Sequence, residues 1–370
     1  MSTPHFHPLT VKALTPLTAD AAQITFAIPP DLRDAFAFTP GQFVTLRAQV
    51  DGVSVRRSYS ICSTPGLLAS TQEISIGVKR MPGGVLSTWA TQQLRVGDVV
   101  DVMPPEGRFT VRNPQARQRV AFVAGSGITP VLSIMAHTVA AQPDAQFTLV
   151  YGNQRVSSIM FSEELQDLKD RYPERVSLVH VLSRQPSEVA VQQGRLDDAK
   201  VAELLRALLP ASQIDEAFIC GPEAMIESTE RALHAAGVPA ERVHAERFAS
   251  GIAQQKQDAI NTGAAYARST LSTDKKAFEF ALSVVLDGKT HSMGMNAQDN
   301  VLDTALQDGL DLPYACKGGV CCTCRAKVLE GQVRMEKNFT LEQWEIDKGF
   351  VLTCQAHCVS KKVVVSYDER

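Results

Sequence analysis

Six of the eight cysteines lie between Cys316 and Cys358, and four of them have a spacing suited to metal chemistry. The pattern is Cys316-x4-Cys321-x2-Cys324, followed by Cys354 after 29 intervening residues. Four thiolates in this order hold the two irons of a plant-type [2Fe–2S] cluster, two on each iron. A structural zinc site would need a second Cys-x2-Cys pair or histidine partners, and only Cys321 and Cys324 form such a pair. The spacing therefore predicts a [2Fe–2S] cluster, and with it electron transfer.

The residues between these cysteines fit the same interpretation. Gly318 and Gly319 allow a tight bend and can direct backbone N–H groups toward the sulfurs, which tunes the reduction potential. Cys322 lies inside the loop but off the spacing, so we interpret it as a small packing residue. Cys358 is also surplus, and we assign it no function.

A second group of residues could bind phosphates. Gly125-Ser126-Gly127 follows a predicted buried strand and precedes a predicted helix, where phosphates can approach the backbone at a helix N-terminus. Thr129 and Pro130 come next, and proline suits the first helical turn. Cys220-Gly221-Pro222 ends a later strand, where a lone thiol is more often a core residue than a catalytic one.

Two further motifs lie in the N-terminal third. Arg57-Ser58-Tyr59-Ser60 is followed by Gly83-Gly84, with Ser87 three residues later. Taken alone, the first could be a strand with a charged edge and the second an ordinary glycine turn. The order in which the two motifs occur, upstream of the glycine loop, is the feature on which a family resemblance depends.

The overall composition is that of an ordinary globular protein. The 370 residues are 44% hydrophobic and 21% charged, and the net charge is −3. The absence of a basic excess argues against nucleic-acid binding. No apolar stretch approaches the roughly 20 residues that cross a membrane, and no signal-peptide pattern begins the chain, so we expect a cytoplasmic protein.

The first hundred residues are predicted to form an antiparallel β-barrel, because short apolar or alternating runs are separated by Gly, Pro and Asp turns. The runs are 11–14, 23–28, 42–48, 73–79 and 99–103. From about residue 113, strands alternate with helices, which predicts a parallel, doubly wound α/β sheet. Its strands are expected at 119–124, 146–151, 176–182 and 216–220, and its helices at 130–141, 162–171, 199–209 and 223–236.

Residues 249–276 are rich in Ser, Gln, Ala, Gly and Thr, and we interpret them as a linker. Beyond it, runs 278–286 and 289–295 predict a hairpin that turns at Asp287-Gly288. A helix at 301–308 and a strand at 362–367 flank the cysteine loop. The predicted domains are therefore 6–112, 113–248 and 277–370.

In this order the motifs resemble the ferredoxin–NADP reductase superfamily, here with a C-terminal plant-type ferredoxin domain of α+β (β-grasp) fold. The resemblance implies an FAD-binding barrel in which Arg57 pairs with a flavin phosphate, Tyr59 lies against the isoalloxazine and Ser60 bonds the ring. Cys220 would lie beside the nicotinamide, and Glu246-Arg247-Phe248 resembles the segment that closes the nucleotide domain near the flavin. The expected catalytic residues are Cys220, Tyr59 and Ser60. The expected cofactor contacts are Arg57, Ser58, Tyr59, Ser60, Gly83, Gly84, Ser87, Gly125, Gly127, Thr129, Pro130, Ser183, Arg184, Cys220, Gly221, Pro222 and Phe248.

Ser183-Arg184 follows the third strand of the α/β domain, where members that prefer NADPH place such a pair against the 2′-phosphate. Arg155 in the preceding loop could assist, and we expect NADPH rather than NADH. An arginine on a surface loop is, however, usually just solvated.

Stretches 35–42, 56–63, 102–110, 316–331 and 349–355 more closely resemble the reductase subunits of bacterial phenylacetyl-CoA epoxidases. That resemblance implies a multi-subunit di-iron oxygenase as the electron acceptor. Reductases of ring and steroid hydroxylases share the architecture and remain alternatives, as does a free-standing electron carrier with several acceptors. A redox-sensing regulator is a third possibility, but no DNA-binding element supports it. Residues 249–276 would allow the ferredoxin domain to move between flavin and partner.

Overall fold

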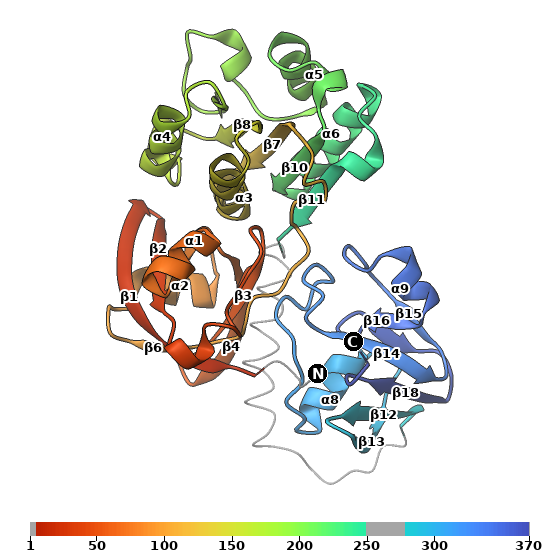
Figure 1. The fold of residues 1–370 in the computed structure, drawn as a ribbon. Helices are drawn as coiled ribbons and strands as arrows, with labels where there is room; N and C mark the ends of the chain where they lie inside the picture. The colour runs from red at the N-terminus through yellow and green to blue at the C-terminus, as the bar shows by residue number, and fades with distance from the viewer. Residues whose placement is uncertain (1–4, 249–277, 370) are drawn as a thin grey trace.

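The computed structural model describes residues 5–248 and 278–369, which form three domains (Figure 1). A β-barrel lies at the lower left in red and orange, an α/β domain lies above it in yellow and green, and a third domain lies at the lower right in blue. The three-domain fold predicted from the sequence is confirmed. The predicted linker, 249–276, lies outside the described residues.

The N-terminal domain is a closed, antiparallel six-stranded barrel. The strand order is β4-β3-β6-β1-β2-β5, and a bridge between Ile61 and Ile76 joins the two edges. Residues such as Leu9, Ile24 and Ile76 point inward and are fully buried, as period-two alternation requires. The strands are β1 (His7–Thr18), β2 (Ala21–Ala27), β3 (Phe43–Val50), β4 (Val53–Ser60), β5 (Glu73–Lys79) and β6 (Val99–Val102).

Two helices of this domain were not predicted. Helix α1 (Pro65–Thr71) begins with a proline in its first turn, which needs no N–H partner there. Helix α2 (Val85–Gln92) begins directly after Gly84 and packs Leu86 and Ala90 into the barrel core. The Gly83-Gly84 motif therefore lies at the N-terminus of a helix.

The second domain is a five-stranded parallel sheet with the order β11-β10-β7-β8-β9. The first strand of the domain, β7, pairs with both β8 and β10, so the chain reverses direction across the sheet at this point. In such sheets, ligands bind at the carboxyl ends of the strands where the order reverses. The strands are β7 (Gln118–Ala124), β8 (Gln146–Asn153), β9 (Val176–Leu182), β10 (Glu216–Gly221) and β11 (Val243–Arg247), and the helices are α3 (Ile128–Ala141), α4 (Ser162–Arg171), α5 (Asp198–Ala207) and α6 (Glu223–Ala235).

The barrel has its own hydrophobic core and also contributes residues to a core of the α/β domain. Cys62 and Phe109 of the barrel region belong to the same buried cluster as Val131 and Phe218 of the α/β domain. A Cβ atom on Gly77 of β5 would lie 2.5 Å from the Thr129 methyl group, so the two domains pack closely at this point.

The third domain has a mixed sheet with the order β13-β12-β18-β14-β16 and its own core. Strands β12 and β18 are parallel neighbours although they come from opposite ends of the domain. The predicted hairpin at Asp287-Gly288 is present. The elements are β12 (Phe280–Leu286), β13 (Lys289–Met295), α8 (Val301–Gln307), β14 (Arg325–Glu330), β15 (Val333–Met335), α9 (Gln343–Asp347), β16 (Phe350–Leu352), β17 (Ala356–Cys358) and β18 (Lys362–Ser366).

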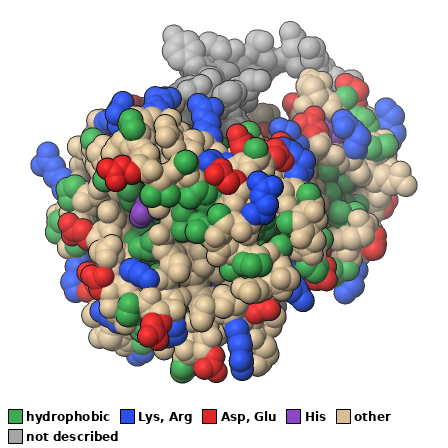
Figure 2. All heavy atoms as spheres, turned by 90° about the horizontal axis from the view of Figure 1, so that it is seen from above, with side chains coloured by type: hydrophobic (Ala, Val, Ile, Leu, Met, Phe, Trp, Pro, Cys, Tyr) green, Lys and Arg blue, Asp and Glu red, His purple; other side chains and the backbone are tan. Residues whose placement is uncertain are grey.

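The described helices include none that is long and apolar enough to cross a membrane. On the face shown in Figure 2, basic and acidic side chains are interspersed.

Candidate functional site

The four predicted cluster ligands are brought together in the third domain. Among residues 5–248 and 278–369, no three His, Cys, Asp or Glu side chains converge on one point as ligands of a single metal ion would. Cys316 hydrogen-bonds Cys321 and Cys324 hydrogen-bonds Cys354, and all four thiols also interact electrostatically. This arrangement fits two irons with two thiolates each better than one zinc ion with four.

Hydrogen-bond donors surround these sulfurs. The N–H of Gly318 donates to Cys316 Sγ over 3.3 Å, and the N–H of Val320 also bonds this sulfur. Gln355 Nε2 lies 3.5 Å from Cys354 Sγ. Such donors stabilise charge on the sulfurs, so the donor set fits a thiolate-bound cluster.

The loop that carries three of the ligands has an unusual backbone. Lys317, Gly319 and Cys322 all have positive φ, at 49°, 77° and 63°. The loop is tied to the segment with the fourth ligand because Thr353 Oγ1 donates to Cys324 O over 2.9 Å. Cys322, predicted to be a packing residue, is half-buried at one of the strained positions.

Adjacent parallel strands bring the glycine loop and the Cys220 motif into contact. A Cβ atom on Gly127 would lie 2.1 Å from Cys220 O, so only glycine fits where the loop passes the end of β10. Tyr151 donates to Gly125 O over 2.9 Å and holds the other side of the loop. The two motifs therefore form one site at the carboxyl ends of β7 and β10.

Cys220, Glu246 and Ser60 meet at the boundary of the barrel and the α/β domain. Cys220 pairs with Glu246 across β10 and β11, and Ser60 Oγ donates to Glu246 Oε2 over 3.5 Å. Burial raises the pKa of the Cys220 thiol well above its ordinary value, and Glu246 adds to that effect. Burial also raises the pKa of Glu246 to about 8, although part of its surface faces a cavity. At neutral pH both groups are therefore mostly protonated.

The other predicted flavin residues lie on β4 and at the start of α2. Arg57 and Tyr59 are half-buried on β4, and Ser58 Oγ lies 3.3 Å from Thr45 Oγ1. Ser87 Oγ accepts from the N–H of Met81 over 3.1 Å and donates to Gly84 O over 3.3 Å, so it holds the glycine turn. A Cβ atom on Gly84 would lie 2.5 Å from Ser87 Oγ, which explains the glycine there.

The loops after β8 and β9 lie side by side. Ser183 N–H donates to Asn153 O over 2.9 Å, and Arg184 N–H donates to Gln154 O over 2.9 Å. Arg184 and Arg155 are both exposed on these loops. The hydrogen bonds thus place two guanidinium-bearing residues on neighbouring loops at the ligand-binding edge of the sheet.

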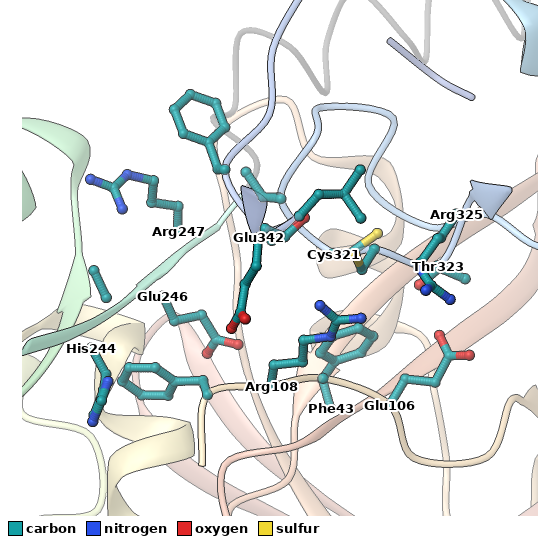
Figure 3. A pocket seen from close by; sticks show the side chains of 18 of the residues that line it. Phe43, Glu106, Arg108, His244, Glu246, Arg247, Cys321, Thr323, Arg325 and Glu342 are labelled. Carbon is teal, nitrogen blue, oxygen red and sulfur yellow. The ribbon is translucent and has the colours of Figure 1, made fainter. Parts of the chain in front are cut away.

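A cavity of about 730 Å³ lies where the three domains meet (Figure 3). Barrel residues, β11 and the cysteine loop all contribute to its walls. The polar side chains and thiols around it include Arg108, His244, Glu246, Arg247, Cys321 and Glu342.

Several residues of this junction were not predicted from the sequence. Arg108 binds Glu345 of the third domain, and Phe43 contacts Cys321. These partners are more than 230 residues apart in the chain, so no local pattern links them. Glu246 was placed in a closing segment, but its proximity to Cys220 follows from the pairing of β10 with β11.

Comparison with known proteins assigns each domain. Residues 8–111 match the oxidoreductase FAD-binding domain, residues 122–231 the oxidoreductase NAD-binding domain, and residues 284–359 the 2Fe-2S iron-sulfur cluster binding domain. The chain therefore belongs to the family of oxygenase reductase components in which these three domains follow one another. It is an oxidoreductase with FAD, nicotinamide nucleotide and [2Fe–2S] as its cofactors.

Several relatives, including the following two, match over nearly the whole chain. A subunit of the 1,2-phenylacetyl-CoA epoxidase of Escherichia coli K12 is 42% identical over 99% of this chain and 98% of its own length. The 3-ketosteroid-9-alpha-monooxygenase ferredoxin reductase component of Rhodococcus rhodochrous is 35% identical over 97% and 96%. Phthalate dioxygenase reductase has the same fold, with a TM-score of 0.58, 20% identity and 98% of each chain covered.

Proposed function

We propose that this chain is the NADPH-dependent reductase of a cytoplasmic multi-subunit oxygenase, and that the oxygenase is a di-iron phenylacetyl-CoA epoxidase. The full-length similarity to the epoxidase subunit of Escherichia coli supports this acceptor. The observation that carries the proposal is the order of the sites. Ser60, Cys220 and Glu246 meet between the flavin and nucleotide domains, and Cys321 contacts Phe43, which pairs with Ser60 across β3 and β4.

We infer that the nucleotide enters at the Gly125–Pro130 loop. The start of α3 offers backbone N–H groups to its phosphates. Gly127, Cys220, Gly221 and Pro222 form the wall against which the nicotinamide end would lie, with Thr129 and Pro130 holding the first turn of α3. The buried Cys220 thiol is protonated, so its role is to position rather than to attack.

We assign the flavin to β4 and the Gly83-Gly84 turn. Arg57 would bind a flavin phosphate, and Ser58, Tyr59 and Ser60 would hold the ring, with Ser87 keeping the turn in shape. Phe248 follows β11 and is 38% exposed, so it is available to cover the flavin. Bound FAD accepts a pair of electrons from a nicotinamide and returns them singly, as a one-electron cluster requires.

Support for NADPH comes from Arg184 and Arg155 on the neighbouring loops. A guanidinium binds phosphate through planar, charge-assisted hydrogen bonds, and the 2′-phosphate distinguishes NADPH from NADH. Ser183, bonded to Asn153 O through its N–H, would fix the loop that carries Arg184.

An anaerobic titration with NADPH, followed by the visible spectrum, tests the reductase chemistry. We expect loss of flavin absorbance together with reduction of the iron–sulfur bands, and extraction should release FAD. The acceptor is tested separately by adding the remaining epoxidase subunits. Phenylacetyl-CoA should then accelerate NADPH oxidation, whereas no acceleration would rule out this oxygenase and favour a steroid or ring hydroxylase.

A further inference from the structure

The ferredoxin domain meets the barrel in a different way from the α/β domain. The barrel contributes Ala21, Cys62 and Phe109 to a large apolar core of the α/β domain. The described ferredoxin residues instead form a small apolar cluster with Phe43, made of Ala315, Cys316 and Cys321. Around this small cluster the described contacts are largely ionic. An interface of this kind is expected to be weak and sensitive to salt.

Phe43 is held rigidly where it contacts the cluster ligand. Its backbone exchanges two hydrogen bonds with Glu106, of 2.8 and 2.9 Å. A Cβ atom on Gly107 would lie 2.9 Å from the Phe43 ring, so the ring fits closely against the following turn. Phe43 also pairs with Ser60 across β3 and β4, which places both side chains on one face of the sheet. One side chain thus lies next to the flavin motif and against Cys321.

Two arginines of the barrel domain hold the ferredoxin domain at this contact. Arg108 forms two hydrogen bonds with Glu345, of 2.5 and 2.8 Å, and the Glu345 side chain is fully buried. Arg56 binds Asp311 over 2.6 Å and donates to Leu312 O over 3.1 Å. We call Arg56–Asp311 and Arg108–Glu345 the docking pairs.

Two other ion pairs join the described parts of these domains. Arg112 and Glu342 lie 3.4 Å apart with both side chains about half exposed, and Arg47 lies 3.9 Å from Asp311. Exposed pairs of this kind contribute little, whereas bidentate pairs with a buried partner contribute more. Arg108 and Arg112 therefore form a matched pair for an experiment, because Arg108 binds a buried carboxylate and Arg112 an exposed one.

We propose that the surface formed by Phe43 and the docking pairs is where the cluster receives electrons, and that Phe43 fixes how closely Cys321 approaches the flavin site. This proposal rests on the reductase function above. In each transfer one electron leaves the reduced flavin and reduces the cluster by one electron, and NADPH supplies both electrons in total. In this arrangement Cys321 is 7% exposed and packs against Phe43 and residues of its own loop.

The test uses the full-length holoprotein with Arg108→Gln, Phe43→Ala and, as the control, Arg112→Gln. Small-angle X-ray scattering measures docking without relying on activity. We expect a larger radius of gyration for Arg108→Gln at low salt, the same expansion of the unmodified protein at high salt, and no change for Arg112→Gln. Stopped-flow spectra should show unchanged flavin reduction by NADPH, with cluster reduction roughly tenfold slower in Arg108→Gln, because a lost charged hydrogen bond is worth about 1.5 kcal/mol or more.

Phe43→Ala should also slow cluster reduction. Phe43→Leu keeps most of the apolar volume, so it should fold normally and slow cluster reduction less than Phe43→Ala does. The proposal would be overturned if Arg108→Gln and Phe43→Ala both had the radius of gyration and the rate of cluster reduction of the unmodified protein. An expanded variant with wild-type cluster reduction would also overturn it, since transfer would not need this contact. If NADPH fails to reduce the flavin of the unmodified protein, the proposed function fails, while scattering still decides whether the docking pairs hold the domain.

Discussion

Glu246 is a carboxyl that burial keeps protonated near neutral pH, since its pKa is raised to about 8. Its neighbours across the strand and the domain boundary are Cys220 and Ser60. Because the pKa in the folded protein exceeds that in the unfolded chain, the folded state binds the extra proton between about pH 4.5 and pH 8. Its contribution to stability is thus present below the unfolded value and is lost as the pH rises through 8.

This pKa predicts a pH-dependent step. Reduction places negative charge on the flavin, and an ionised Glu246 nearby would oppose it. We expect the rate of flavin reduction by NADPH to fall above pH 8 in the unmodified protein. Glu246→Gln, which cannot ionise, should lose that fall. The measurement is the stopped-flow rate of flavin reduction between pH 6 and pH 10, a range of about four pH units that brackets the pKa. If the pH profile of Glu246→Gln is the same as that of the unmodified protein, the ionisation belongs to another group.

Arg184 is expected to determine the choice of nucleotide. Arg184→Ala should raise the Michaelis constant for NADPH by roughly tenfold or more, because a charge-assisted phosphate contact is lost. The constant for NADH should change little, since NADH has no 2′-phosphate. Steady-state kinetics with both nucleotides test this directly. Equal effects on NADPH and NADH would refute the assignment.

At the scale of elements, the contact between the glycine loop and β10 leaves no space for a side chain. Gly127→Ala would place a Cβ atom 2.1 Å from Cys220 O and force β7 and β10 apart. We expect the variant to lose nucleotide binding, measured by calorimetric titration, and to unfold at a lower temperature. Gly66→Ala is the control, because a Cβ atom in α1 would meet only Thr64 Oγ1 at 3.5 Å. A Gly127→Ala protein that binds nucleotide normally would contradict the close contact.

The elements that the sequence predicted best are those with strong local signals. The ranges of α4 and β9 agree at both ends, because apolar periodicity and clear turn residues bound them. Strands β15, β16 and β17 were missed because each has three residues, too few for any periodic pattern. Helix α2 was missed because its start was interpreted as a phosphate turn.

The residues of the candidate site also fall into those with a local sequence signal and those without one. The four cysteines and the glycine motifs are local patterns, so they can be predicted from the sequence alone. The contacts of Phe43, Arg56 and Arg108 depend on how folded domains meet, and their partners lie hundreds of residues away in the chain. The stretch 56–63 begins with Arg56, but nothing in its sequence indicates Asp311 as the partner.

At the scale of the whole molecule, the cores predict which parts unfold together. The barrel has a core of its own, but its residues Ala21, Cys62 and Phe109 also belong to the core of the α/β domain, whereas the core of the ferredoxin domain includes, among the described residues, none of the other two domains. We therefore expect two transitions in scanning calorimetry of the holoprotein, one for residues 5–248 and one for the ferredoxin domain. A single transition would show instead that the docking pairs couple all three domains.

Cys354→Ser tests the assignment of these transitions. Cys354 belongs to the core of the ferredoxin domain and carries the ligand from its distant segment, so losing it removes both the cluster and a link between two segments. We expect the iron–sulfur absorbance to disappear and the ferredoxin transition to fall by roughly 10 °C or more, because a bound metal centre stabilises the fold that forms it. The other transition and flavin reduction by NADPH should stay unchanged.

Cys322→Ser is the matched control, since this half-buried thiol lies in the same loop outside the ligand pairs and its loss should leave the cluster spectrum intact. Loss of the cluster in Cys322→Ser, or its retention in Cys354→Ser, would show that the ligand set is wrong.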